Sequence, residues 1–146
     1  MKKIITLCLF SFSLLLSSCA TTVDAFYSAH ADQFSVKSVY LVSHAPESDE
    51  MDDRIKRELM KRNMQVVVGP DTKKVTTEDA IMKYTETWKT DITRNIETLD
   101  IILFDKNGEV IASSHWKNSK YSTLTTMSSI VSDTLQIIFE KVQVRP

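Results

Sequence analysis

Apolar side chains recur along the chain with two different spacings after one long apolar run near the N-terminus. The run covers residues 4–16 and contains no charged residue. Further on, alternation of apolar and polar residues or short runs rich in β-branched residues predict strands, and spacings of three and four residues predict amphipathic helices. The predicted strands are Val36–Ser43, Gln65–Val68, Asp79–Thr90, Leu99–Asp105 and Glu109–Trp116, and the predicted helices are Met51–Arg62 and Ser122–Val142.

The first helix is predicted to link two parallel strands. Met51, Ile55 and Leu59 recur every four residues and form one apolar stripe. Asn63 follows as a residue that tolerates the left-handed conformation in which many helices end. A strand, a helix and a second apolar strand at Gln65–Val68 indicate a βαβ unit with a right-handed crossover.

A hairpin is the clearest local prediction. Lys106, Asn107 and Gly108 separate two apolar strands, and Asn-Gly between such strands is the strongest short-range hairpin signal. The predicted order is therefore β-α-β-β-β-β-α. We expect an α/β (α+β) fold in which a mixed sheet of four to five strands carries two helices on one face.

Composition narrows the class of protein. The chain has 146 residues, a formal net charge of −1, two glycines and three prolines. This length predicts one domain with a conventional core, which we place at residues 36–146. The balanced charge, without a basic stripe, argues against a nucleic-acid partner.

The N-terminal segment has the features of a bacterial export signal. Lys2 and Lys3 precede the apolar run, which ends in Leu16-Ser17-Ser18-Cys19 and resembles the lipobox of bacterial lipoproteins. The resemblance implies cleavage between Ser18 and Cys19, a thioether-linked lipid on Cys19 and N-acylation of the same residue. An ordinary secretory peptide and a membrane helix are the alternatives, although the run is shorter than the ~20 residues that span a bilayer.

This interpretation divides the chain into a signal peptide at 1–18, a lipid-anchored tether at 19–35 and the domain. Alternatively, Phe26 and Tyr27 within the tether dock on the domain or on a partner. Cys8 leaves with the signal and Cys19 carries the lipid, so no thiol remains for a disulfide.

The predicted domain resembles the small α/β domain shared by the TolB N-terminal domain, the curli-export lipoprotein CsgG and related envelope lipoproteins. The resemblance extends from about Val36 to Val142. It rests on the element order and on a hairpin with Asp105, Gly108, Glu109 and Trp116 at the positions typical of that group. It implies a non-enzymatic envelope protein, often one that assembles into a complex.

No pattern typical of catalysis or cofactor binding is present in the sequence. His30, His44 and His115 are not part of a metal-ligand spacing, so we expect no metal and no cofactor. Ser113 and Ser114 lie beside His115, but adjacent strand residues point to opposite faces and cannot form one hydrogen-bonded unit. We therefore expect no enzyme.

An interface is the alternative that the apolar residues suggest. If both helices cover one sheet face, Trp88, Ile102, Phe104, His115 and Trp116 are candidates for an exposed interface on the other. The competing explanation places these aromatic residues in the core.

The sequence thus predicts a lipid-anchored binding or assembly component whose domain faces the periplasm. The residue after Cys19 is Ala20 and not the Asp typical of inner-membrane retention, which favours the outer membrane. The expected partners are the membrane, through the lipid, and an envelope protein or a second copy of the chain. A homo-oligomeric structural subunit is the alternative, followed by a ligand-binding protein or enzyme with a cleft that the sequence does not reveal.

Overall fold

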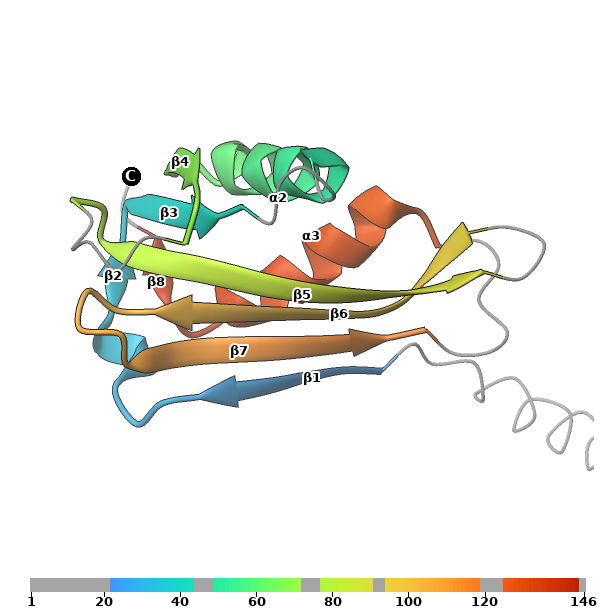
Figure 1. Cartoon of the computed structure of the whole chain (residues 1–146). Coiled ribbons are helices and arrows are strands. Elements are labelled where there is room, and N and C mark those ends of the chain that lie inside the picture. Colours follow the sequence, from blue (N-terminus) through green and yellow to red (C-terminus); the bar gives the residue numbers. More distant parts are fainter. Residues whose placement is uncertain (1–21, 44–48, 72–76, 91–93, 119–124, 145–146) are drawn as a thin grey trace, which may run out of the picture.

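The computed structural model describes residues 22–43, 49–71, 77–90, 94–118 and 125–144, and these form a mixed α/β fold (Figure 1). The predicted signal segment, Cys19 and His44 lie outside the described residues. The α/β class predicted from the sequence is confirmed.

A six-stranded sheet has the order β1-β7-β6-β5-β3-β4, and a separate two-stranded sheet pairs β2 with β8. The strands are β1 (Thr22–Tyr27), β2 (Ser35–Val36), β3 (Ser38–Val42), β4 (Gln65–Gly69), β5 (Ala80–Thr90), β6 (Arg94–Phe104), β7 (Val110–Lys117) and β8 (Gln143–Val144). The helices are α2 (Asp49–Lys61), α3 (Met127–Ile138) and the short 3-10 helix η2 (Ala31–Gln33).

The local predictions around α2 and the hairpin are confirmed. Strands β3 and β4 pair in parallel on either side of the α2 crossover. Asn63 follows α2 with φ 61°, and Gly108 takes φ 84° in the turn between β6 and β7. Asp105 holds this turn together, because its carboxylate accepts hydrogen bonds from the backbone N–H groups of Asn107 and Glu109, both at 2.8 Å.

Strand β1 differs from the prediction of a tether at residues 19–35. It pairs antiparallel with β7 along its whole length and forms one edge of the sheet. Val23 and Tyr27 pack against the core. The Tyr27 hydroxyl donates a hydrogen bond to the backbone carbonyl of Ile137 in α3. The other four side chains of β1 are exposed, which left too weak an alternation for the sequence to reveal the strand.

The sheet is accordingly larger than the predicted four to five strands, and α3 is shorter than the predicted Ser122–Val142. Thr126 caps α3 by accepting a hydrogen bond from the backbone N–H of Ser129 at 3.2 Å. Val142 is buried, but it lies after the helix and leads into β8.

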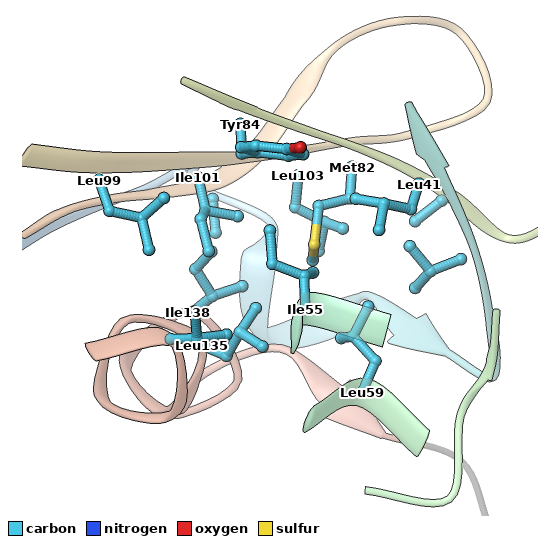
Figure 2. Packing of buried hydrophobic residues seen from close by; sticks show 14 of the residues in the cluster. Leu41, Ile55, Leu59, Met82, Tyr84, Leu99, Ile101, Leu103, Leu135 and Ile138 are labelled. Atoms are coloured by element: carbon cyan, nitrogen blue, oxygen red, sulfur yellow. The ribbon is translucent and has the colours of Figure 1, made fainter. Parts of the chain in front are cut away.

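Both helices lie on one face of the sheet, and the core fills the space between the helices and the sheet. Helix α3 contacts β6, β7 and β1, whereas α2 contacts β4 and α3. Figure 2 shows the packing of side chains from the sheet and from both helices, among them Leu41, Met82, Ile101, Leu103, Ile55, Leu59, Leu135 and Ile138. The predicted arrangement of two helices on one face is therefore present.

Candidate functional site

The sheet face opposite the helices, which we call the open face, is the candidate site. No helix covers it among the described residues (Figure 1). The register aligns its side chains in rows that run across the strands, because cross-strand partners share a face. The first row, which we call the apolar row, crosses five strands and consists of Val67, Tyr40, Ile81, Phe104 and Val110.

The open face changes from apolar to polar along the strand direction. The next row is mixed and contains Lys83, Ile102, Ser113 and Phe26. The row after that is polar and contains Thr85, Asp100, His115 and Asp24. The polar row lies toward the end of the sheet at which β1 begins and β7 ends, so the apolar row lies at the end farther from Thr22.

The polar row contains a histidine–carboxylate pair. The Nδ1 atom of His115 lies 2.6 Å from an Asp100 carboxylate oxygen, and the side chains are 42% and 41% exposed. Asp24 faces His115 from β1 on the other side. A pair with this much exposure is screened by solvent, so it contributes little to stability and lies on a surface instead of in an enclosed site.

Tyr40 lies on the open face and packs against the edge strand β4, whereas Tyr27 lies on the helix side of β1. The Tyr40 ring lies over Gly69, where an added Cβ atom would overlap the hydroxyl, and that hydroxyl donates to the carbonyl of Pro70 at 2.9 Å. Burial and the nearby charge of Glu140 raise the pKa of Tyr27.

Asp79 joins the beginnings of β3 and β5. Its carboxylate accepts hydrogen bonds from the backbone N–H groups of Lys37 and Ser38, at 2.9 and 3.0 Å, and from the Ser38 hydroxyl at 3.2 Å. Burial pushes the pKa of Asp79 upward, but these hydrogen bonds outweigh it and hold the pKa below its ordinary value.

The structure separates the five predicted interface residues into two groups. Ile102, Phe104 and His115 lie on the open face, as an interface requires. Trp116 is fully buried on the helix side, and its indole N–H has no hydrogen-bond partner among the described residues. Trp88 is half-buried against the core. The two tryptophans thus follow the core alternative in the single chain.

A buried carboxylate is the feature that the sequence did not reveal. Asp52, in α2, is 5% exposed and accepts hydrogen bonds from the Ser43 hydroxyl at 2.5 Å and from the Tyr84 hydroxyl at 2.7 Å. The sequence indicated only a favourable charge near the helix N-terminus. Ser43 also borders an open recess of about 300 Å³, together with Val68, Gly69 and Pro70. This arrangement ties β3, α2 and β5 together, and the recess lining that the structure describes contains no ionisable side chain.

The described residues show neither a metal cluster nor a membrane-spanning helix. No group of three or more His, Cys, Asp or Glu side chains among them could hold a metal ion. None of the helices in the described part of the chain is long and apolar enough to cross a membrane.

Known structures are similar to the chain in fold. A point variant of the PelC dodecamer from Paraburkholderia phytofirmans is 16% identical, with a TM-score of 0.57, and the match covers 86% of this chain and all of that one. The PelC dodecamer in another crystal form gives 15% identity, a TM-score of 0.56 and the same coverage. A minor lipoprotein from Acinetobacter baumannii is 14% identical over 74% of this chain and 97% of that one, with a TM-score of only 0.35.

No protein-family model matches the chain, and no curated protein sequence is similar to it. The similarity to PelC at this level of identity therefore shows a shared fold.

Proposed function

We propose that the chain is a non-catalytic, lipid-anchored component of the bacterial cell envelope that binds or assembles with other proteins. The observation that carries the proposal is the N-terminal pattern of two lysines, the apolar run and Leu16-Ser17-Ser18-Cys19. Lipidation and N-acylation of Cys19 would give three acyl chains, more than the two signals that stable anchoring needs. Ala20 favours the outer membrane, with the domain facing the periplasm.

Because β1 begins soon after Cys19, the proposed anchor would hold one end of the sheet close to the membrane. Only Ala20 and Thr21 separate Cys19 from the first residue of the sheet. Three residue steps reach at most about 10 Å. The end of the sheet that contains Thr22 and its partner Lys117 would therefore lie close to the lipid headgroups.

A homo-oligomeric envelope subunit is the form of this function that the fold favours. The two PelC structures that share the fold are dodecamers. The open face supplies a surface with exposed apolar side chains, which is what subunit contacts use. The second copy of the chain is thus the first partner to test.

A purely binding or structural role also agrees with the chemistry of the described residues. The histidine–carboxylate pair of His115 and Asp100 lies on a broad surface, and the recess beside Ser43 is lined by uncharged groups. Neither arrangement places a nucleophile beside an oriented base, as nucleophilic catalysis requires.

Metabolic labelling of cells with radioactive palmitate tests the anchor. We expect label on the wild-type chain and none on Cys19→Ala, and recovery of the wild-type chain with outer-membrane vesicles after density fractionation. Absence of label, or label that persists in Cys19→Ala, would contradict the lipid anchor. Light scattering of the detergent-solubilised chain tests self-association, and a monomer at all concentrations would contradict the homo-oligomer.

A further inference from the structure

We propose that a second copy of the chain docks on the open face, sheet against sheet, about a two-fold axis parallel to the strands. The inference deepens the proposed function and rests on it for the anchor and for self-association. It identifies the surface that makes the contact and the orientation of the two copies relative to the membrane.

The exposed apolar side chains support a contact on this face. Phe26 is 60% exposed and Val67 is 46% exposed, and they lie on the two edge strands of the open face. Ile81, Ile102 and Phe104 lie between them and are half-buried. These five residues lie on four of the six strands, including both edges of the sheet, whereas isolated exposed apolar residues would carry no such meaning.

A pair of copies would need most of the area of the open face. Six strands spaced about 4.8 Å apart, with side chains in rows about 7 Å apart, give the open face roughly 600 Å² in projection. Standard interfaces bury ~800 Å² of accessible surface per partner. Because side chains protrude, the accessible area of the open face exceeds its projected area, but the standard value is reached only if most of the face takes part. A partner that covers the whole sheet fits this requirement, and a sheet of the same size does so best.

The gradient from apolar to polar selects the direction of the axis. A two-fold axis parallel to the strands places the apolar row of one copy against the apolar row of the other, and the polar rows together at the opposite end. An in-plane axis perpendicular to the strands would instead place Phe104 and Ile81 near Asp100 and His115, and would desolvate those polar groups without partners.

The anchor selects the same axis. An axis parallel to the strands leaves both copies of Thr22 at one end of the pair, so both Cys19 lipids can enter one membrane. A perpendicular in-plane axis would place the two anchors at opposite ends of the pair. An isologous contact closes at the dimer, so a larger assembly needs a further contact elsewhere on the chain.

A matched pair of lysine variants tests the surface in the full, lipidated chain. Val67→Lys introduces a charge into the apolar row, and Met60→Lys introduces the same charge at a residue of α2 that is 55% exposed and lies in the helix layer. Because burying an unpaired ammonium is unfavourable, we expect Val67→Lys to weaken self-association about tenfold or more in light scattering, and Met60→Lys to leave it unchanged. Circular dichroism confirms that both variants are folded.

Thiol cross-linking in the native envelope tests the axis. Residues near a two-fold axis meet their own copies, and Thr85 lies on β5, at the middle of the open face. Packed sheets are about 10 Å apart, so a bismaleimide of similar length should join Thr85→Cys to itself and should not join the α3 control Gln136→Cys.

The outcomes separate this inference from the proposed function. A wild-type chain that is monomeric overturns this inference and the homo-oligomeric form of the proposed function, whereas the lipid anchor is tested separately by palmitate labelling. An oligomer that Val67→Lys leaves intact, or one that Met60→Lys weakens equally, overturns the open-face contact alone. An oligomer sensitive to Val67→Lys in which Thr85→Cys links only to other proteins, or not at all, overturns the two-fold arrangement.

Discussion

Replacement of Tyr84 by phenylalanine should destabilise the chain more than the loss of an ordinary hydrogen bond. The Tyr84 side chain is 2% exposed, and its hydroxyl donates to Asp52 at 2.7 Å. The variant keeps the ring and removes one of the two hydroxyl groups that donate to the buried Asp52 carboxylate among the described residues, and it leaves the Ser43 hydroxyl in place.

The expected magnitude follows from the burial of the acceptor. Hydrogen bonds to charged groups contribute about 1.5–3 kcal/mol, compared with about 1 kcal/mol for neutral pairs. We therefore expect Tyr84→Phe to lower the free energy of unfolding by about 2 kcal/mol. With an m-value on the order of 2 kcal/mol/M in urea, the unfolding midpoint falls by about 1 M.

Tyr40→Phe is the matched control. It removes a hydroxyl that donates to the Pro70 carbonyl at an exposed site, where water can replace the lost partner. We expect its effect to stay below about 0.5 kcal/mol. Urea unfolding followed by the fluorescence of the buried Trp116 measures both variants.

A double-mutant cycle then isolates the interaction with the carboxylate. Combining Tyr84→Phe with Asp52→Asn should give a coupling energy of about 1 kcal/mol or more, since the two side chains are in direct contact. Equal effects of Tyr84→Phe and Tyr40→Phe, or additive effects in the cycle, would refute the argument that a buried carboxylate organises this part of the fold.

Three further predictions concern the supports of the sheet. Asp79→Asn should destabilise the chain at neutral pH. Because the folded-state pKa of Asp79 is lowered, its contribution is present above the unfolded pKa of about 3.9 and is lost as the pH falls through the folded value, so the difference from wild type in urea unfolding should shrink below pH ~4. Gly69→Ala should lower the thermal midpoint, with a cost of about 1–3 kcal/mol, because the new methyl group overlaps the Tyr40 hydroxyl and forces that ring to move; an unchanged midpoint would contradict this. Asp105→Ala deprives two backbone N–H groups of the hairpin turn of their acceptor and should cost about 1–2 kcal/mol in urea unfolding, whereas the exposed neighbour Lys106→Ala should cost almost nothing.

The parts of the fold that the sequence revealed depend on local signals. Asn63 and Gly108 mark backbone positions with positive φ, and each stands at the end of a strongly periodic segment. The stripe of Met51, Ile55 and Leu59 is fully buried, as its spacing predicted. In each case the neighbouring residues determine the conformation, so no knowledge of distant contacts is needed.

The parts that the sequence did not reveal depend on partners far along the chain. Strand β1 pairs with a strand almost ninety positions later, and only two of its side chains touch the core. Asp52 meets Tyr84 across 32 positions, so its role as an acceptor is invisible in the local sequence. The residues of the open face likewise become known only from the register of five strand pairings. Trp88 and Trp116 were chosen as interface candidates because of their size, but they lie on the helix side of the sheet.

The replacement of the expected tether by β1 changes how the proposed anchor would act. A flexible segment of residues 19–35 would have a root-mean-square length of roughly 20–25 Å and would let the domain adopt any orientation above the membrane. Three residue steps allow at most about 10 Å, so the proposed anchor would keep the start of β1 near the headgroups. Two copies anchored in this way would diffuse in one plane, with their open faces at similar heights. This confinement raises their effective concentration, as it does for linked binding modules. A face of roughly 600 Å² in projection, which is small for association in solution, can therefore suffice at the membrane. For the same reason, the lipidated chain should self-associate more tightly than Cys19→Ala, with the same open-face residues responsible in both.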